Sequence, residues 1–391
     1  MSFSIDVSWK SLNKQGEELC GDKVEVLRTK DSDIVILADG MGSGVKANIL
    51  ATLTSKILGT MLREGATIES CVETVAKTLP ICKVRKVAYA TFSILQIFHS
   101  GEAYLAEFDN PSCVFIRDGK IVKYPYEVRE IEGKKVHESR FQVKKNDCFT
   151  LMSDGVIYAG AGSILNLQGW TWEAMSEYTL KCTKKTLSAS RLVVMLSQAC
   201  DELYEEKPGD DTTVAVARVI ERRVVSIFTG PPAKKEDDER AVRDFMHAEG
   251  KKVVSGGTSA NVVARVLGKE VVTKIDTADP DVPPMAVIDG IDLVTEGVLT
   301  LGKSLKLLKK YARGEFDAEF FDELDVDNGA SRLARLLIEE CTELNLFVGT
   351  AVNAAHKETE LNFELSMRQN LVEQLVRTAE EMEKKVTVRY Y

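Results

Sequence analysis

The stretch that most constrains the fold is an apolar run that ends in an acid and a glycine loop, Val35-Ile36-Leu37-Ala38-Asp39-Gly40-Met41-Gly42-Ser43-Gly44. The uninterrupted apolar residues predict a strand that is buried on both faces. A buried strand seldom ends in a bare carboxylate, because an unpaired buried charge is very costly. We therefore expect a positive group to meet Asp39, and we expect Gly40, Gly42 and Gly44 to let the backbone turn tightly beside a ligand.

The same arrangement of an acid at a strand end occurs at three more places. An apolar run closes on Ser153-Asp154-Gly155, Gly209-Asp210-Asp211 precedes the run from 212 to 217, and Asp22 stands just before the strand expected at 23–27. Carboxylates at strand ends can converge on one point of a folded domain, where they repel one another unless cations lie between them. Oxygen-only clusters suit hard ions such as Mg²⁺ or Mn²⁺.

The alternative is that each acid belongs to an ordinary turn. Asp-Gly is a common turn dipeptide, and Asp118-Gly119 is interpreted as a turn and no more, between short strands at 113–116 and 121–124. The four acidic positions together are more specific than any one of them, because their order, spacing and flanking strands agree.

With these motifs, residues 1–222 resemble the metal-dependent Ser/Thr protein phosphatases of the PPM type, and within them the bacterial branch typified by sporulation stage II protein E. The resemblance rests on Asp22, on the loop 39–44, on 153–155 and on 209–214. It implies an α+β fold in which an α-β-β-α sandwich carries a two-metal centre at one end.

The resemblance also implies the metal ligands. Asp39 would bridge two Mn²⁺ or Mg²⁺ ions, with the carbonyl oxygen of Gly40 as a further ligand. Asp22 would support the first ion, directly or through water, and Asp154 and Asp210 would hold the other.

Two more acids remain open in the same site. Asp211 stands where the family often has Asn, so we expect it to lie behind the direct ligands. Asp109 falls where many of these phosphatases carry an Asp that can hold a third metal ion. Asn110-Pro111 follows it, however, and also makes a good turn.

The activity that the resemblance implies is hydrolysis of phosphoserine or phosphothreonine by a metal-activated water in bacterial signalling. The expected partner is a small phosphoprotein, such as an anti-sigma-factor antagonist. Eukaryotic relatives hold the phosphate with an Arg ahead of the first acid, whereas here only Lys10 and Lys14 precede Asp22. Phosphate affinity would therefore depend on the metals. The alternative function is a catalytically inactive phosphatase-fold scaffold or ligand-sensing module, against which the intact acids argue.

The length of 391 residues suggests two domains, which we place at 1–222 and 223–391. Strands and helices alternate after residue 223, which predicts a smaller α/β domain, and its place beside a catalytic domain suggests a regulatory role. Within it, Gly256, Gly257 and Thr258 open a helix, as an anion site or merely as a capped turn. The segment 291–311 reads as one long helix.

A helix is also expected directly after the glycine loop. Its apolar residues recur every four positions, and we expect this face to pack on the sheet. The residues are Val45, Ile49, Leu53, Ile57 and Met61.

Composition narrows the class of partner. The net charge of −9 argues against a nucleic acid and against an anionic membrane surface. No apolar stretch approaches the roughly 20 residues that span a bilayer, and the first residues lack the features of a secretion signal. We expect a cytoplasmic protein, and a homodimer is compatible with the sequence.

Overall fold

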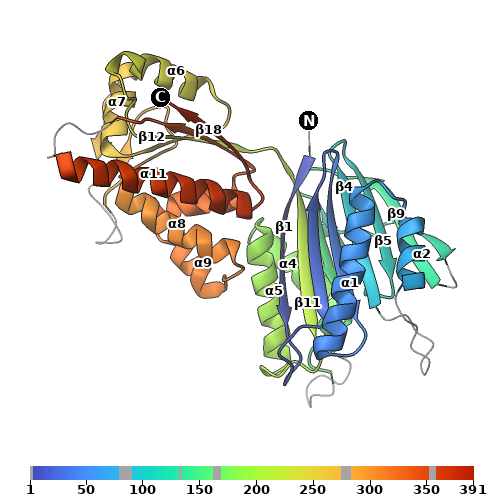
Figure 1. Cartoon of the computed structure of the whole chain (residues 1–391). Helices are drawn as coiled ribbons and strands as arrows, with labels where there is room; N and C mark the ends of the chain where they lie inside the picture. Colours follow the sequence, from blue (N-terminus) through green and yellow to red (C-terminus); the bar gives the residue numbers. More distant parts are fainter. Residues whose placement is uncertain (1–2, 79–89, 132–133, 162–168, 274–282, 352–357) are drawn as a thin grey trace. The chain divides into compact units, whose positions relative to one another are not determined.

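The computed structural model describes residues 3–78, 90–131, 134–161, 169–273, 283–351 and 358–391. It divides into two compact units, Met1–Glu221 and Arg222–Tyr391, and each is described by itself (Figure 1). No helix within the described ranges is both long enough and apolar enough to span a membrane.

The first unit contains two antiparallel sheets. One sheet has the order β1 (Phe3–Leu12), β11 (Thr212–Glu221), β10 (Cys148–Met152), β6 (Val114–Arg117) and β7 (Lys120–Ile121). The other has the order β2 (Asp22–Arg28), β3 (Ser32–Gly40), β4 (Ala90–Phe98), β5 (Glu102–Phe108), β9 (Lys134–Gln142) and β8 (Glu127–Ile131).

Helices cover the outer face of each sheet. The helices α1 (Gly44–Arg63) and α2 (Ile68–Thr78) pack on the sheet that contains β3, and α4 (Trp172–Thr183) and α5 (Ala189–Leu203) pack on the sheet that contains β1 (Figure 1). The α-β-β-α sandwich expected from the sequence is therefore confirmed for this unit.

The strand β3 is buried on both faces, which explains its uninterrupted apolar sequence. Ile34, Ile36 and Ala38 face the helices α1 and α2, whereas Val35 and Leu37 face the other sheet. All five side chains are fully buried. Both cores therefore fix the register of the strand, and with it the position of Asp39 near the end of the strand.

The expectation for the inner face of α1 was wrong for the first half of the stripe and right for the second. Val45, Ile49 and Leu53 are 60%, 51% and 47% exposed, so they face solvent. Ile57 and Met61 are partly buried and pack against the core beside the sheet. The buried residues are smaller, namely Gly44, Ala47, Ala51, Thr54, Ser55, Leu58, Gly59 and Leu62. Small side chains let the helix lie close to the sheet, and a search for large apolar residues at helical spacing misses such a face.

The second unit is built on a largely parallel sheet. Its order is β14 (Val272–Thr273), β15 (Ala286–Val287), β16 (Leu293–Thr295), β13 (Lys251–Ser255), β12 (Val224–Thr229), β17 (Glu343–Val348) and β18 (Lys385–Tyr390). The pairings among β16, β13, β12, β17 and β18 are parallel. The chain runs outward from β12 in both directions, which is the doubly wound α/β arrangement.

Helices lie on both faces of this sheet (Figure 1). One face carries α6 (Asp238–His247), which follows the short 3-10 helix η1 (Lys235–Asp237), and α7 (Gly257–Leu267). The others are α8 (Val298–Ala312), α9 (Ala318–Asp325), α10 (Gly329–Glu339) and α11 (Glu358–Glu381).

The single long helix expected over 291–311 was also wrong. Leu293–Thr295 forms the strand β16, and α8 begins only after Gly297. Leu293 and Val294 are buried and pair in parallel with Val253 and Val254 of β13. Burial between two helical layers favours the strand over the helical periodicity of the segment.

Candidate metal centre

Strand register brings acids from distant parts of the chain to one end of the first unit. Asp22 lies directly opposite Asp39 in the β2–β3 pair. In the other sheet, the N–H of Ser153 donates to the carbonyl oxygen of Thr213, which joins the end of β10 to the start of β11. Asp154 begins the short helix α3 (Asp154–Ile157), next to Ser153.

The acids of the two sheets face the same interior. Successive side chains of a strand point to opposite faces, so a residue two positions along the strand points the same way as the acid. Leu37, two positions before Asp39, and Val24, two positions after Asp22, line the core between the sheets. Two and four positions after Asp211 come Thr213 and Ala215, and Ala215 lines the same core. The carboxylates therefore cap one end of that core.

The electrostatics of Asp39 show how close the acids are. The pKa of Asp39 is raised to about 9, first by burial and then by the negative charges of Asp22, Asp154, Asp210 and Asp211, in that order of effect. Four carboxylates from both sheets therefore act on the fifth. This convergence is what the motif pattern predicted for these positions.

Asp22 is the most deeply buried acid of the group. Only 4% of its surface is exposed, and burial raises its pKa to about 7. The hydroxyls of Ser153 and Thr213 lie near enough to lower that pKa, but neither carboxylate oxygen meets a donor at hydrogen-bonding geometry. The two hydroxyls are engaged elsewhere: Ser153 Oγ accepts from the N–H of Thr213, and the Thr213 hydroxyl donates to Ser11.

Lys14 supplies positive charge at the edge of the group. Its Nζ lies 3.5 Å from Oδ1 of Asp210, and its backbone N–H donates to Oδ1 of Asp211 at 3.1 Å. The sequence placed this lysine near the acids without assigning it a contact. No sequence signal gives this contact, because it depends on the β1–β11 register, which pairs Leu12 with Thr212 and so sets the residues beyond them opposite each other.

The strand-end acids have the charge and the donor atoms that hard cations need, but their side chains are not at metal-ligand spacing. Among the described residues, no three His, Cys, Asp or Glu side chains lie close enough together to hold one ion as they stand. The buried oxygens of Asp22 and Oδ2 of Asp211 nevertheless have no hydrogen-bond partner. Mutually repelling, unsatisfied carboxylates are what a divalent cation stabilises, so the residues fit Mn²⁺ or Mg²⁺.

Gly40 is needed for packing at this position. A Cβ on Gly40 would lie 2.0 Å from the carbonyl oxygen of Ala47 in α1. The N–H of Gly40 donates to the carbonyl oxygen of Gly21, just before Asp22. The missing side chain thus allows the loop of Asp39, the helix α1 and the segment of Asp22 to meet.

Asp109 lies in the turn after β5, where it is exposed and has a φ of 55°. Burial lowers the pKa of Lys134, and the charge of Asp109 raises it. The next residue links this turn to the centre, because Asn110 accepts from the hydroxyl of Thr91, the cross-strand partner of Asp39. A third ion at Asp109 stays a prediction.

The residues proposed from the sequence as an anion site form the N-terminus of α7. Gly256 has a φ of 114°, and its N–H donates to the carbonyl oxygen of Thr295. Gly257 and Thr258 are exposed, and a Cβ on Gly257 would meet no atom within 4 Å. The glycine turn is thus present, and its ligand stays a prediction.

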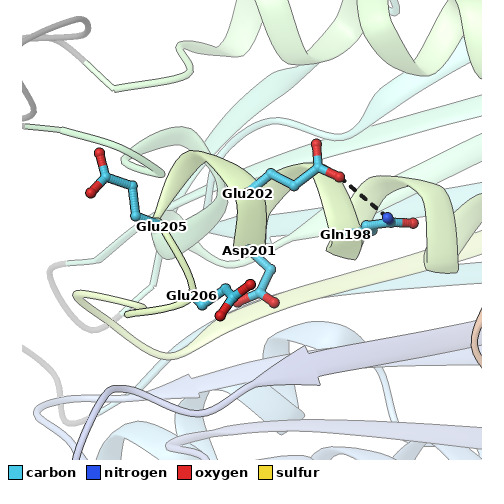
Figure 2. A pocket seen from close by; sticks show the side chains of 5 residues that line it. All are labelled: Gln198, Asp201, Glu202, Glu205 and Glu206. Carbon is cyan, nitrogen blue, oxygen red and sulfur yellow. Dashed lines mark hydrogen bonds between the residues drawn. The ribbon is translucent and has the colours of Figure 1, made fainter.

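A separate hollow of about 510 Å³ lies at the C-terminal end of α5 and in the turn that follows (Figure 2). Its lining is acidic except for one amide, whose Nε2 donates to Oε1 of Glu202. The lining residues are Gln198, Asp201, Glu202, Glu205 and Glu206. None of these is one of the strand-end acids.

Residues 30–220 match the family described as Stage II sporulation protein E (SpoIIE). The matched residues all lie in the first unit. The recognition made from the strand-end acids is therefore confirmed. No curated protein sequence is similar enough to this chain to count as a match.

Solved structures similar to this chain cover the SpoIIE part. The PP2C phosphatase domain and a fragment of the regulatory domain of SpoIIE from Bacillus subtilis is 20% identical, with a TM-score of 0.48. The match covers 56% of this chain and 64% of that one, so this chain spans less than two thirds of its length.

Two similar structures hold divalent ions. RsbX in complex with magnesium is 20% identical, with 55% of this chain and 95% of that chain covered and a TM-score of 0.40. The catalytic domain of the serine threonine protein phosphatase PstP in complex with 2 manganese ions is 14% identical, with 56% and 100% covered and a TM-score of 0.37.

Proposed function

We propose that the SpoIIE domain hydrolyses phosphoserine or phosphothreonine on a protein and needs Mn²⁺ or Mg²⁺ to do so. One observation carries the proposal. Two sheets of a phosphatase-family domain direct Asp22, Asp39, Asp154, Asp210 and Asp211 to one end, where their charges raise the pKa of Asp39. Such a site is costly to fold without cations and is suited to hold them.

The ligands follow from the positions of these acids. Asp39, which feels the other four charges, would lie between two ions together with the carbonyl oxygen of Gly40. Asp22 would hold the first ion, and Asp154 and Asp210 the second. When bound, the ions lower the pKa of a water molecule and offset negative charge on the phosphoryl oxygens.

The remaining residues keep this arrangement in place. Oδ1 of Asp211 accepts the N–H of Lys14, so Asp211 fixes the loop between β1 and β2 beside the centre. Ser153 Oγ accepts the N–H of Thr213 and so ties together the strands that precede Asp154 and follow Asp210. Truncating either bond would shift two carboxylates at once.

The substrate class is proposed from the family resemblance. A small phosphoprotein such as an anti-sigma-factor antagonist would be the partner, in bacterial signalling. The second unit would regulate the first, and comparing the activity of fragment 1–221 with that of the full chain would measure this control.

The test is Mn²⁺-dependent hydrolysis of p-nitrophenyl phosphate by wild type, Asp39→Asn and Asp154→Asn. Asp118→Asn is the matched control, because Asp118 lies in the β6–β7 turn and Asn tolerates its φ of 50°. We expect the two site variants to lose activity by about a hundredfold or more and the control to keep it. Full activity in both folded site variants would refute the proposal.

The alternative is a catalytically inactive scaffold or ligand-sensing module. The observation in its favour is that no three described side chains stand at metal-ligand spacing. A calorimetric titration with MnCl₂ separates the two functions. Absence of binding at millimolar Mn²⁺ favours the scaffold, and binding that is lost in Asp39→Asn favours the enzyme.

A further inference from the structure

The loop between β1 and β2 is tied to two of the segments that carry the acids of the centre. The N–H of Gln15 donates to the carbonyl oxygen of Pro208 at 2.8 Å, just ahead of Asp210. On the other side, the hydroxyl of Ser43 donates to Oε1 of Glu17 at 3.1 Å, at the start of α1. Gln15 and Glu17 thus hold the loop to the segment before Asp210 and to the segment after Asp39.

Lys14 is the residue of this loop that enters the centre. Its backbone is fixed by the hydrogen bond to Asp211, and its Nζ lies 3.5 Å from Oδ1 of Asp210. Its charge also acts on Asp154, whose pKa is raised by burial and by Asp210 and lowered by Lys14. One ammonium group therefore offsets part of the charge of the two acids proposed to hold the second ion.

The ion pair of Lys14 and Asp210 is weak enough for a metal ion to replace the ammonium. The side chains of Lys14 and Asp210 are 37% and 46% exposed, so water screens the pair and its net stabilisation is small. A lysine ammonium is a hydrated point charge on a flexible stem. A divalent cation carries twice the charge and takes carboxylate oxygens directly, so it displaces the ammonium from Asp210.

We propose that Lys14 is an exchangeable counter-ion, which neutralises Asp210 while the metal sites are empty and binds the phosphoryl oxygens of the substrate once cations have taken Asp210. The inference rests on the proposed function and adds a residue for substrate recognition. It also replaces the sequence-based expectation that phosphate affinity depends on the metals alone.

The binding of phosphate by Lys14 follows from the hydrogen bond that fixes its backbone. The hydrogen bond between the N–H of Lys14 and Asp211 does not involve the side chain, so it persists when the ammonium leaves Asp210. The ammonium then stays within one side-chain length of the centre, where a phosphoryl dianion must come to react. Lysine is a common phosphate ligand as a point charge.

The first test measures metal binding. MnCl₂ is titrated calorimetrically into the full-length wild type, Lys14→Met and Lys14→Arg. Lys23→Met is the matched control, since Lys23 is exposed and follows Asp22 on β2, where alternate side chains point to opposite faces. We expect Lys14→Met to bind Mn²⁺ about three- to fivefold more tightly than wild type, because this factor corresponds to the free energy of an exposed ion pair. Lys14→Arg and Lys23→Met should bind Mn²⁺ as wild type does.

The second test measures phosphate binding at saturating Mg²⁺. Inorganic phosphate is used as an inhibitor of p-nitrophenyl phosphate hydrolysis. We expect its inhibition constant to rise about tenfold in Lys14→Met and to recover in Lys14→Arg, because only the charge is needed. A merely structural role for Lys14 would weaken Mn²⁺ binding in Lys14→Met instead of tightening it.

The outcomes distinguish this inference from the function on which it rests. If wild type binds no Mn²⁺, the proposed function fails and the inference with it. If wild type binds Mn²⁺ but Lys14→Met binds it equally or more weakly, or is inhibited by phosphate as strongly as wild type, the exchange alone is refuted.

Discussion

Replacing the central acid by its amide should stabilise the metal-free protein. In Asp39→Asn the side chain keeps its shape, and the neutral amide does not have to take up a proton to avoid the repulsion of four neighbouring carboxylates. Most substitutions of buried residues destabilise, so a gain in stability would be specific to charge repulsion at this site.

The magnitude follows from the pKa of Asp39, which is raised from 3.8 to about 9, first by burial and then by the neighbouring charges. At pH 7 Asp39 is protonated in the folded protein, although pH 7 is about three units above the pKa that it has in the unfolded chain. Holding this proton lowers the free energy of unfolding by about 4 kcal/mol, at about 1.4 kcal/mol per unit. This is an upper limit, because water and side-chain movement relieve part of the repulsion. We expect a gain of about 1–3 kcal/mol, or several degrees in Tm.

The assay is thermal unfolding in EDTA and again in excess MnCl₂. Asp39→Asn should melt above wild type in EDTA, and Mn²⁺ should raise the Tm of wild type but not of the variant. Asp33→Asn on the same strand is the control with opposite sign, because the Asp33 carboxylate accepts hydrogen bonds from Ser4 and Ile5 and pairs with Arg28. A lower Tm for Asp39→Asn in EDTA would refute the reasoning.

Three further predictions test the packing and the charge of the same region. Leu58→Ala should cost about 2–5 kcal/mol because Leu58 is fully buried, whereas Ile49→Ala should cost less than about 0.5 kcal/mol because it is half exposed, as urea unfolding would show. Gly40→Ala should lower the Tm by many degrees and abolish Mn²⁺ binding, since its Cβ would collide with the backbone of α1. Without metal, stability should fall as pH rises from about 4 through 7 to 9, because the folded pKa values of Asp22 and Asp39 lie above the unfolded one and the folded state holds more protons; a flat profile in EDTA would contradict this.

The strand-end acids could be found from sequence because two constraints coincide at each of them. A strand buried on both faces has a long apolar run, and an acid at its end is rare without a function. Asp39 and Asp154 satisfy both conditions. The order of the motifs then identified the family, which the match over 30–220 confirmed.

The inner face of α1 could not be found in this way. Periodicity detects large apolar residues, but the contact with β3 is made largely by small ones such as Ala47 and Ala51. Their low hydrophobicity hides the buried face, and the larger Val45 and Ile49 draw attention to the solvent face. Only the close approach at Gly40 shows why small residues are required.

The contact of Lys14 and the strand β16 depend on tertiary pairing. Lys14 meets Asp210 because β1 and β11 pair in one particular register, which the two strand sequences do not specify. The segment Leu293–Thr295 is so short that its sequence fits a helix as well as a strand. Its pairing with β13 makes it a strand.

The most direct test of the central claim is an anomalous difference map from crystals soaked in MnCl₂. Two peaks should lie between the sheets, each about 2–2.5 Å from carboxylate oxygens, with Asp39 in contact with both and Asp154 and Asp210 on the second. Ordered carboxylates at Asp22, Asp39, Asp154 and Asp210 with no peak among them, at Mn²⁺ concentrations that saturate any binding in solution, would contradict the account.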